Sequence, residues 1–211
     1  MMRRLLRRAW SGAVLLAIAS CAVQPAPAAE VPQAALKHRS ELTRNARALV
    51  GMDAPVPMFA AQIHQESRWR SNAKSPVGAQ GMAQFMPATA EWIAGLFPAL
   101  ASNDPYNPSW AMRALVTYDL WLYERIRAAS ACQRWAFALS AYNGGLGWVN
   151  RDKKLASSKG LDPLVWFGSV EQVNAGRSAA NWRENRDYPK RILYRHQPTY
   201  IQAGWGLGVC S

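Results

Sequence analysis

Residues 64–90 read HQESRWRSNAKSPVGAQGMAQFMPATA, and they begin where an apolar helical run ends in a single acidic residue, Glu66. Phe59, Ile63 and Glu66 are spaced by four and three residues, which places them on one face of a helix. Burial on that face and the negative end of the helix dipole both disfavour a charged carboxyl, so we expect a raised pKa for Glu66. A carboxyl that stays protonated near neutral pH can act as a general acid toward a poor leaving group, such as a glycosidic oxygen. The alternative, which the helix taken alone favours, is a surface carboxylate paired with Arg68 or Arg70.

The segment that follows Glu66, residues 75–90, changes this balance. Its glycines allow close approach of a backbone, its amide and hydroxyl side chains form uncharged hydrogen bonds, and its apolar side chains supply walls. These residues are Gly78 and Gly81; Ser75, Gln80 and Gln84; and Met82, Phe85 and Met86. The mixture predicts a site for an uncharged polar polymer such as a sugar chain, whereas a phosphate site would need a Lys and a glycine loop that enters a helix. The alternative is a structural loop whose methionines pack inward.

The whole chain has 211 residues, of which 25 are Lys or Arg and 13 are Asp or Glu, giving a net charge of +12. This length is sufficient for one domain with a proper core. A basic protein is attracted to polyanions such as anionic lipids, acidic wall polymers or nucleic acid. We expect no nucleic-acid partner, because the sequence has no zinc knuckle, no aromatic RNA-binding signature and no basic heptads.

The first 21 residues, MMRRLLRRAWSGAVLLAIASC, have a basic start and an apolar run too short to span a bilayer. They are typical of an export signal, and IASC at residues 18–21 looks like a bacterial lipobox with Cys21 as the lipidated residue. One acyl anchor would give a peripheral protein of the cell envelope, attached to a membrane by lipid. The alternative is cleavage within residues 26–30 and a soluble periplasmic protein. Loss of residues 1–20 removes four Arg and lowers the net charge to +8.

The rest of the chain predicts one mainly α-helical domain. Residues 21–35 are rich in Pro and Ala and predict a tether, so the domain would occupy residues 36–211. Helices are expected over residues 42–50, 56–66, 87–97 and 108–126, and over residues 132–144, before a glycine C-cap. The fourth has Asn107 as its N-cap and Pro108 at its first position. Residues 181–204 predict one or two helices, interrupted near Pro189 and Pro198.

Three cysteines and three histidines are present in the sequence. If Cys21 carries lipid, Cys132 and Cys210 remain as a pair in an oxidising compartment, where a disulfide is expected. The alternative is two independent thiols. No Cys or His cluster has the spacing of metal ligands, so we expect neither a metal nor another cofactor.

Four motifs in order resemble those of the lytic transglycosylases of the soluble-lytic-transglycosylase type. The first is Glu66-Ser67. The second, S-x-x-G-A-x-G-L-M-Q-x-M-P-x-T-A, is similar to residues 75–90 but has Met82 for Leu and Ala83 for Met. The third, A-Y-N-A-G, appears as AYNGG at residues 141–145. The fourth, E-T-x-x-Y-V-x-x-I, appears as ENRDYPKRI at residues 184–192, with Asn185 and Pro189 as departures. The resemblance covers roughly residues 50–195.

This resemblance implies a lysozyme-like domain that binds peptidoglycan glycan strands and cleaves the β-1,4 bond between N-acetylmuramic acid and N-acetylglucosamine. Glu66 would be the catalytic residue, first as acid and then as base, and the product would be a 1,6-anhydromuramic end. The resemblance also implies that Ser75 and Gln84 support the carboxyl and the substrate. Residues expected to line the groove are Met86, Tyr142, Asn143 and Tyr188. An enzyme of this kind could serve an envelope-spanning machine.

Two alternatives to this function remain open from the sequence. A hydrolytic muramidase of the same fold would need a second acid, for which Asp119 is the best candidate if it faces Glu66 across the groove. A buried hydrogen-bond acceptor or ion-pair partner is the other interpretation of Asp119. A non-catalytic, glycan-binding envelope lipoprotein is the third function, and Glu66 argues against it. Among the aromatic residues, Trp69, Trp148 and Trp182 lie near the motifs and could stack on sugars, whereas Trp110, Trp121 and Trp135 are expected in the core.

Overall fold

The longest helix of the computed structural model, which describes residues 30–210, is α5 (Pro108–Arg125). It begins where the sequence predicts it. The Asn107 Oδ1 atom accepts hydrogen bonds from the backbone N–H groups of Ser109, at 2.9 Å, and Trp110, at 3.4 Å. Pro108 occupies the first position, where its missing N–H has no helical partner to lose. The N-cap prediction is therefore confirmed.

Helix α6 (Ala131–Gly144) lies at the centre and packs against α5, α7 (Leu146–Ser158) and α8 (Ala179–Lys190). It ends as predicted, at Gly145, whose φ of 92° favours glycine. Near its first residue, Cys132 forms a disulfide with Cys210, as expected from the sequence. The bridge ties α6 to the end of the chain and closes a loop of 78 residues, which in the chain-entropy model contributes roughly 4 kcal/mol.

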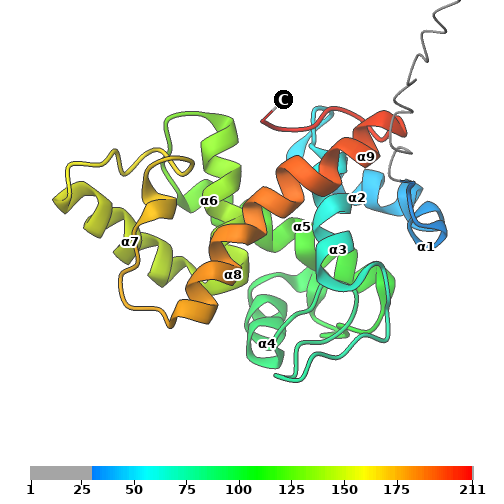
Figure 1. Cartoon of the computed structure of the whole chain (residues 1–211). Helices are drawn as coiled ribbons and strands as arrows, with labels where there is room; N and C mark the ends of the chain where they lie inside the picture. The colour runs from blue at the N-terminus through cyan, green and yellow to red at the C-terminus, as the bar shows by residue number, and fades with distance from the viewer. Residues whose placement is uncertain (1–29, 211) are drawn as a thin grey trace, which may run out of the picture.

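The other half of the domain is built on two helices, α2 (Arg39–Val50) and α3 (Val56–Ser67). Helix α2 packs against both α5 and α3. Helix α3 packs against a continuous rod formed by α8, the π-helix η3 (Arg191–His196) and α9 (Gln197–Gln202), which crosses the molecule diagonally in Figure 1. Fully buried side chains from these elements form the core, including Phe59, Met112, Leu115, Phe137 and Tyr200. Among the described residues there are only isolated β-bridges and no sheet, in agreement with the predicted mainly helical class.

The rod differs from the interruption expected at Pro189. This proline lies inside α8, and the chain continues directly into η3. Pro189 removes one backbone N–H, but the buried side chains of Tyr188, Ile192 and Leu193 hold the helix against its neighbours. The change from α to π geometry directly after Pro189 keeps the rod continuous. Pro198 lies in the first turn of α9, where proline is tolerated.

Short elements complete the fold: α1 (Gln33–Leu36), α4 (Pro87–Leu96), and the 3₁₀ turns η1 (Pro98–Leu100) and η2 (Val170–Gln172). Ala35, which the sequence analysis assigned to the tether, is fully buried, so packed structure already begins before residue 36. The predicted export signal and Cys21 lie outside the described residues. No helix within residues 30–210 is both long and apolar enough to cross a membrane.

Candidate active site

Glu66 lies in the last turn of α3, on the face predicted from its spacing. Phe59 and Ile63 on the same face are fully buried. The helix ends because the next two residues, Arg68 and Trp69, adopt left-handed conformations with φ of 54° and 66°. The N–H of Arg68 still bonds to the helix, at the carbonyl of His64. The turn therefore leaves the Glu66 carboxyl at the end of a rigid helix.

Ser67 fixes this helix end to the segment that follows. Its hydroxyl donates to the carbonyl of Met82 at 2.8 Å and accepts a hydrogen bond from the backbone N–H of Arg70 at 3.1 Å. Ser67 is itself buried. The residue beside Glu66 thus joins α3 to the loop of residues 75–86 and holds the two in register.

The Glu66 carboxyl has no cationic partner among the described residues. Its pKa is raised from 4.5 to about 8, mainly by burial and to a smaller extent by the nearby Glu184 carboxylate. The hydroxyl of Tyr188 donates a hydrogen bond to Glu66 Oε1, which favours the ionised form and partly offsets the increase in pKa. Glu66 is therefore mostly protonated at neutral pH, as predicted from its position on the helix.

The loop of residues 75–86 closely approaches the segment before α5 at Gly81. A Cβ atom there would lie 1.7 Å from the carbonyl oxygen of Pro105, and the φ of Gly81 is 71°. No other residue type fits this position. Within the loop, Ser75 Oγ accepts from the backbone N–H of Ala79 at 2.9 Å, and Gln84 Nε2 donates to the Gly81 carbonyl at 2.8 Å. These hydrogen bonds hold the loop in one conformation, so that it forms one wall of the site.

The opposite wall comes from the end of α6 and from α8. The hydroxyl of Tyr142 donates to the carbonyl of Ala83 at 2.7 Å, which links α6 to the loop. Asn143 follows, and its Nδ2 donates to Glu184 Oε1 at 3.4 Å. Tyr188 reaches Glu66 from the next turn of α8. Four segments distant in sequence therefore meet around one carboxyl.

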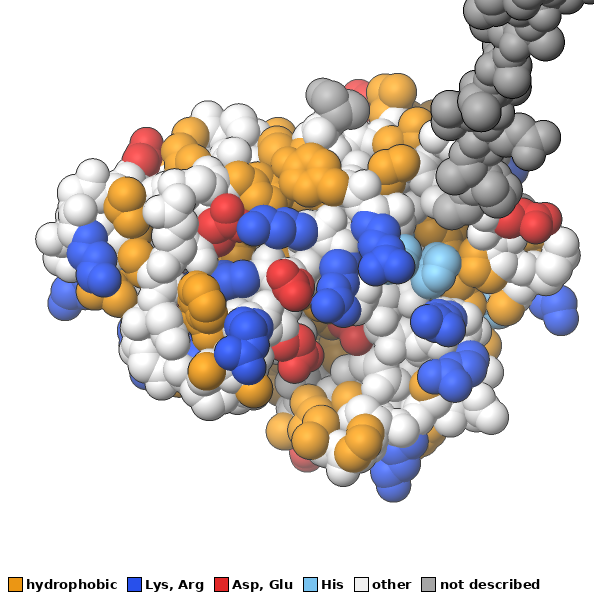
Figure 2. All heavy atoms as spheres, viewed as in Figure 1, with side chains coloured by type: hydrophobic (Ala, Val, Ile, Leu, Met, Phe, Trp, Pro, Cys, Tyr) orange, Lys and Arg blue, Asp and Glu red, His pale blue; other side chains and the backbone are white. Residues whose placement is uncertain are grey.

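A cavity of about 270 Å³ opens beside Glu66. It is lined by Glu66, Ser75, Val77, Ala79, Gln84, Phe85, Met86, Thr89, Tyr118, Tyr142, Asn143 and Glu184. A second cavity of about 180 Å³ is lined by Gln65, Glu66, Asn143, Glu184, Tyr188 and Arg191. Because both cavities are lined by Glu66, the carboxyl lies between two halves of one groove. In Figure 2, acidic side chains gather at a hollow between α8 and α4, with Lys and Arg side chains around them.

Beyond the first cavity the groove becomes aromatic. A third cavity of about 330 Å³ shares Thr89 and Tyr118 with the first and is also lined by Trp92, Trp121 and Leu146. The rings of Trp92 and Trp121 meet edge to face, with centroids 4.9 Å apart. The groove therefore offers a polar, charged end and an aromatic end on opposite sides of Glu66.

The structure brings Ser75, Gln84, Met86, Tyr142 and Asn143 together around the cavity that Glu66 also lines, and Tyr188 contacts Glu66 directly. Other residues that the sequence suggested for the sugar site lie away from this cavity.

The proposed sugar platforms lie elsewhere. Trp69 is buried and donates its indole N–H to Tyr200, Trp182 donates to the carbonyl of Val173, and Trp148 stacks with Arg151. Trp121, expected in the core, lies on the groove instead. Met82 is fully buried rather than part of the groove wall.

Asp119 is fully buried in α5 and lines none of these three cavities. Its Oδ1 accepts from Gln62 Nε2 at 3.3 Å, and burial raises its pKa well above the usual value. Asp119 is therefore a buried hydrogen-bond acceptor, in line with the alternative interpretation of this residue. Across residues 30–210, no three His, Cys, Asp or Glu side chains are grouped so that they could hold a metal ion.

Comparison with known proteins agrees with this geometry. Residues 47–164 match the Transglycosylase SLT domain family. The membrane-bound lytic murein transglycosylase F of Shewanella pealeana is 38% identical over 109 residues, covering 51% of this chain and 21% of the relative. Its counterpart in Vibrio parahaemolyticus is 31% identical over 130 residues, covering 61% and 23%.

Among solved structures, the 70 kDa soluble lytic transglycosylase of Escherichia coli superposes with a TM-score of 0.53 at 21% identity. The match covers 77% of this chain and 24% of that protein, so it supports the fold. The aligned part spans less than a quarter of the length of each of these relatives. Since the family match covers more than half of the 211 residues, the chain belongs to the Transglycosylase SLT domain family.

Proposed function

We propose that this chain is a peptidoglycan lytic transglycosylase that cleaves the β-1,4 bond between N-acetylmuramic acid and N-acetylglucosamine. The observation that carries the proposal is the Glu66 carboxyl, whose pKa is raised to about 8 in the middle of a groove with uncharged polar and aromatic walls. Such walls suit a glycan strand, and a protonated carboxyl suits its glycosidic oxygen. The names of the relatives, which describe lytic murein transglycosylases, support the same activity.

In the first step Glu66 acts as the acid. The Tyr188 hydroxyl occupies Oε1, which leaves Oε2 to face the glycan. The Oε2 proton passes to the glycosidic oxygen as the bond from that oxygen to the muramyl C1 breaks. N-acetylglucosamine leaves with a neutral 4-hydroxyl, and Glu66 becomes a carboxylate that the Tyr188 hydrogen bond stabilises.

In the second step Glu66 acts as the base. Its carboxylate accepts the proton of the muramyl 6-hydroxyl while O6 forms a bond to C1 of the same sugar. The product has a 1,6-anhydro ring, Glu66 regains its proton, and no water is consumed. One carboxyl with two successive roles is sufficient, whereas most glycosidases use two.

Hydrolysis is the second candidate function, and one observation favours it. Glu184 lines both cavities beside Glu66, so a second carboxylate is present in the groove. If water attacked C1, Glu184 would be the residue able to activate it, and Asp119, which lines none of the three cavities, would not. Spacing along the chain favoured Asp119 as the second acid, because it does not show which acid faces the groove.

Mass spectrometry of fragments released from purified peptidoglycan tests these proposals. The wild-type chain, Glu66→Gln and Glu184→Gln should be compared under identical conditions. We expect anhydro-ended products from the wild-type chain and from Glu184→Gln, and none from Glu66→Gln. Reducing ends that disappear in Glu184→Gln would establish hydrolysis instead, and glycan binding without any product would leave a binding module.

We also propose that the domain works in the cell envelope, after export by residues 1–20 and on a tether that begins at residue 21. The basic start of the chain and Cys21 support this location, and the names of the relatives include "membrane-bound". Labelling with radioactive palmitate tests the anchor. The wild-type chain should incorporate label and Cys21→Ser should not, whereas an unlabelled wild-type chain would favour a soluble periplasmic protein.

A further inference from the structure

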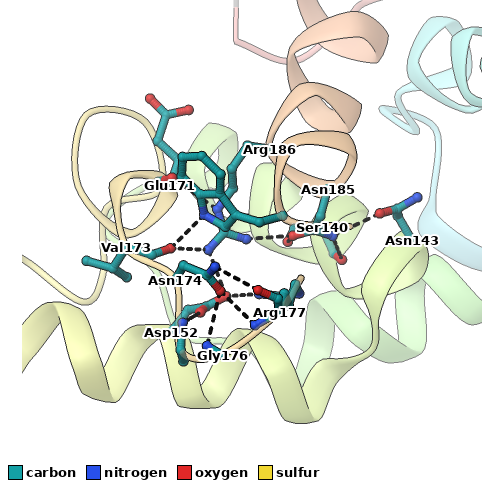
Figure 3. A network of polar contacts seen from close by, with 12 residues as sticks. Ser140, Asn143, Asp152, Glu171, Val173, Asn174, Gly176, Arg177, Asn185 and Arg186 are labelled. Carbon is teal, nitrogen blue, oxygen red and sulfur yellow. Dashed lines mark hydrogen bonds and ion pairs between the residues drawn. The ribbon is translucent and has the colours of Figure 1, made fainter. Parts of the chain in front are cut away.

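A polar network under the groove ends at Asn143, one of the residues that flank Glu66 (Figure 3). Its far end is a buried ion cluster in which Asp152 accepts from both Arg177 and Arg186, the latter at 2.8 Å. Arg186 also donates from Nη1 to Asn185 Oδ1 at 2.7 Å. The cluster is therefore connected to the groove through one amide, that of Asn185.

The chemistry of the partners fixes which way the Asn185 amide points. A guanidinium has donors only, so the atom that contacts Arg186 must be the amide oxygen. The same oxygen accepts from Ser140 Oγ at 2.9 Å, and the amide nitrogen donates to the carbonyl of Ser140 at 2.8 Å. The contacts with Arg186 and with the Ser140 carbonyl therefore indicate the same orientation of the Asn185 amide independently of each other.

This orientation passes to Asn143. The nitrogen of Asn185 donates to Asn143 Oδ1 at 3.0 Å, so the Asn143 oxygen is occupied within the network. The NH₂ group of Asn143 is then directed toward Glu184 and the groove. A glycan beside Glu66 would meet a donor at Asn143, suited to an acetamido or hydroxyl oxygen.

Gly144 makes room for the Asn185 side chain. A Cβ atom on Gly144 would lie 2.7 Å from Asn185 Nδ2, which is too close for a side chain that is only 1% exposed and held by four hydrogen bonds. Gly144 is the departure of the third motif from the family pattern, with Gly for Ala, and Asn185 is one of the two departures of the fourth, with Asn for Thr. Gly144 and Asn185 touch each other in space although they lie 41 residues apart.

We propose that Asn185 and Gly144 act together as a positioning device that holds the Asn143 amide with its NH₂ group toward the glycan. The role as a donor to glycan rests on the proposed function, whereas the orientation of the amide does not. Asn185 touches no substrate in this scheme and acts only through Asn143.

The substitution Asn185→Asp tests the device with little change in shape. The new carboxylate keeps the acceptor for Arg186 and balances the excess positive charge of the cluster, but it loses the donor to Asn143. Asn143 should then rotate its amide and present oxygen next to the Glu184 carboxylate. We expect KM for peptidoglycan strands to rise about tenfold, the loss expected for one hydrogen bond, with kcat changed about twofold or less.

Asn174→Asp is the matched control. Asn174 belongs to the same network, where its Oδ1 accepts from the N–H groups of Gly176 and Arg177, and it makes no contact with Asn143. The same chemical change there should leave KM unaltered. An equal rise in KM in both variants would overturn the proposal, because it would indicate a general loosening of the network.

The glycine provides a second test. Gly144→Ala should displace the Asn185 amide and raise KM about tenfold. Addition of Asn185→Asp should raise KM little further, because both changes remove the same donor to Asn143. If Gly144→Ala lowers only the melting temperature, or if the double variant multiplies the two increases in KM, the coupling is absent and the proposal fails.

A readout without catalysis separates this inference from the proposed function. The side-chain NH₂ resonance of Asn143, followed by NMR in ¹⁵N-labelled protein, should move in Asn185→Asp and Gly144→Ala and stay in place in Asn174→Asp. An unmoved resonance in the first two variants would overturn the positioning role even in an active enzyme. The expected movement in a chain that releases no product would count against the proposed function alone.

Discussion

Two acidic side chains, the half-buried Glu66 at the groove and the fully buried Asp152 in the lobe of α7 and α8, have opposite surroundings. Asp152 is 0% exposed and receives two guanidinium groups and the backbone N–H of Ala175. Glu66 receives one neutral hydroxyl, from Tyr188, and no cation among the described residues. The first acid is paired with cations and the second is not.

The difference shows which of the two acids is suited to proton transfer. A carboxylate held between two arginines supplies the counter-charge for both of them, so it serves as a structural link. A carboxyl that is desolvated in the groove without a cation keeps its proton to about pH 8, and a single hydrogen bond stabilises the anion when the proton leaves. Burial alone therefore does not identify a candidate catalytic acid, and the absence of a cation is the more informative sign.

The largest effect is expected for Glu66→Gln, which removes the proton donor and leaves the shape unchanged. Product release from peptidoglycan should fall about 10³-fold or more, because general acid–base catalysis supplies roughly that factor. The free energy of unfolding should increase in this variant at alkaline pH. The raised pKa means that the folded wild-type chain loses stability as pH rises from 4.5 through about 8, and the glutamine variant avoids this loss.

Thermal unfolding of the wild-type chain and Glu66→Gln at pH 4 and pH 9 measures this second effect. The two melting temperatures should agree at pH 4, and the variant should melt higher at pH 9. Equal melting temperatures at both pH values would mean that Glu66 is an ordinary exposed carboxylate, and the comparison with Asp152 would no longer hold.

Asp152→Asn should have its main effect on stability. It leaves two buried arginines without a counter-charge, a change that typically costs about 3–5 kcal/mol. Urea unfolding measures the loss in the free energy of unfolding. The matched control is Asp187→Asn, since Asp187 pairs with Arg191 at 3.4 Å on an exposed part of α8, where a pair contributes about 0.5 kcal/mol or less. Equal losses in the two variants would contradict the structural role of Asp152.

Tyr188→Phe should change the pH dependence. The Tyr188 hydrogen bond lowers the pKa of Glu66, so its removal should raise that pKa further. The alkaline limb of kcat/KM, expected near pH 8 in the wild-type chain, should move to higher pH because Glu66 keeps its proton longer. Tyr200→Phe is the control, since the Tyr200 hydroxyl contacts His64 and Trp69 instead. A limb that stays near pH 8 in Tyr188→Phe would mean that another group controls it.

The sequence was sufficient for features that depend on neighbouring residues. The Asn107–Pro108 start of α5, the Gly145 end of α6 and the position of Glu66 on α3 all follow from local spacing and capping. The four motifs then brought together most of the residues around the candidate site. Each of these features is decided within a few residues of the chain or by a resemblance that covers the site.

Features decided by tertiary contacts were not accessible. Helix α7 has few buried apolar positions, and its buried charge, Asp152, is held by arginines from α8 and the preceding loop. Trp92 and Trp121 meet at the groove only because α4 packs near α5. The contact of Gly144 with Asn185 joins two helices that are distant in sequence. No local pattern reports such pairings.

Asp119→Asn should have the smallest effect and is the sharpest test of the comparison. Like Glu66, Asp119 has no cationic partner among the described residues and its pKa is raised, but it is fully buried and lines none of the three cavities of the groove. Its Oδ2 has no hydrogen-bond partner among the described residues, and Oδ1 accepts from Gln62. A neutral Asn reproduces a protonated Asp in shape and charge, so kcat should change by about twofold or less and the products should be unaltered.

Product analysis of Asp119→Asn beside Asp119→Leu measures this. The leucine variant removes the acceptor for Gln62 and should lose stability, by about 1–3 kcal/mol, while the product ends stay the same. A change from one kind of product end to another in either variant would make Asp119 a participant in the reaction. Access to the groove would then be unnecessary for a catalytic acid in this fold.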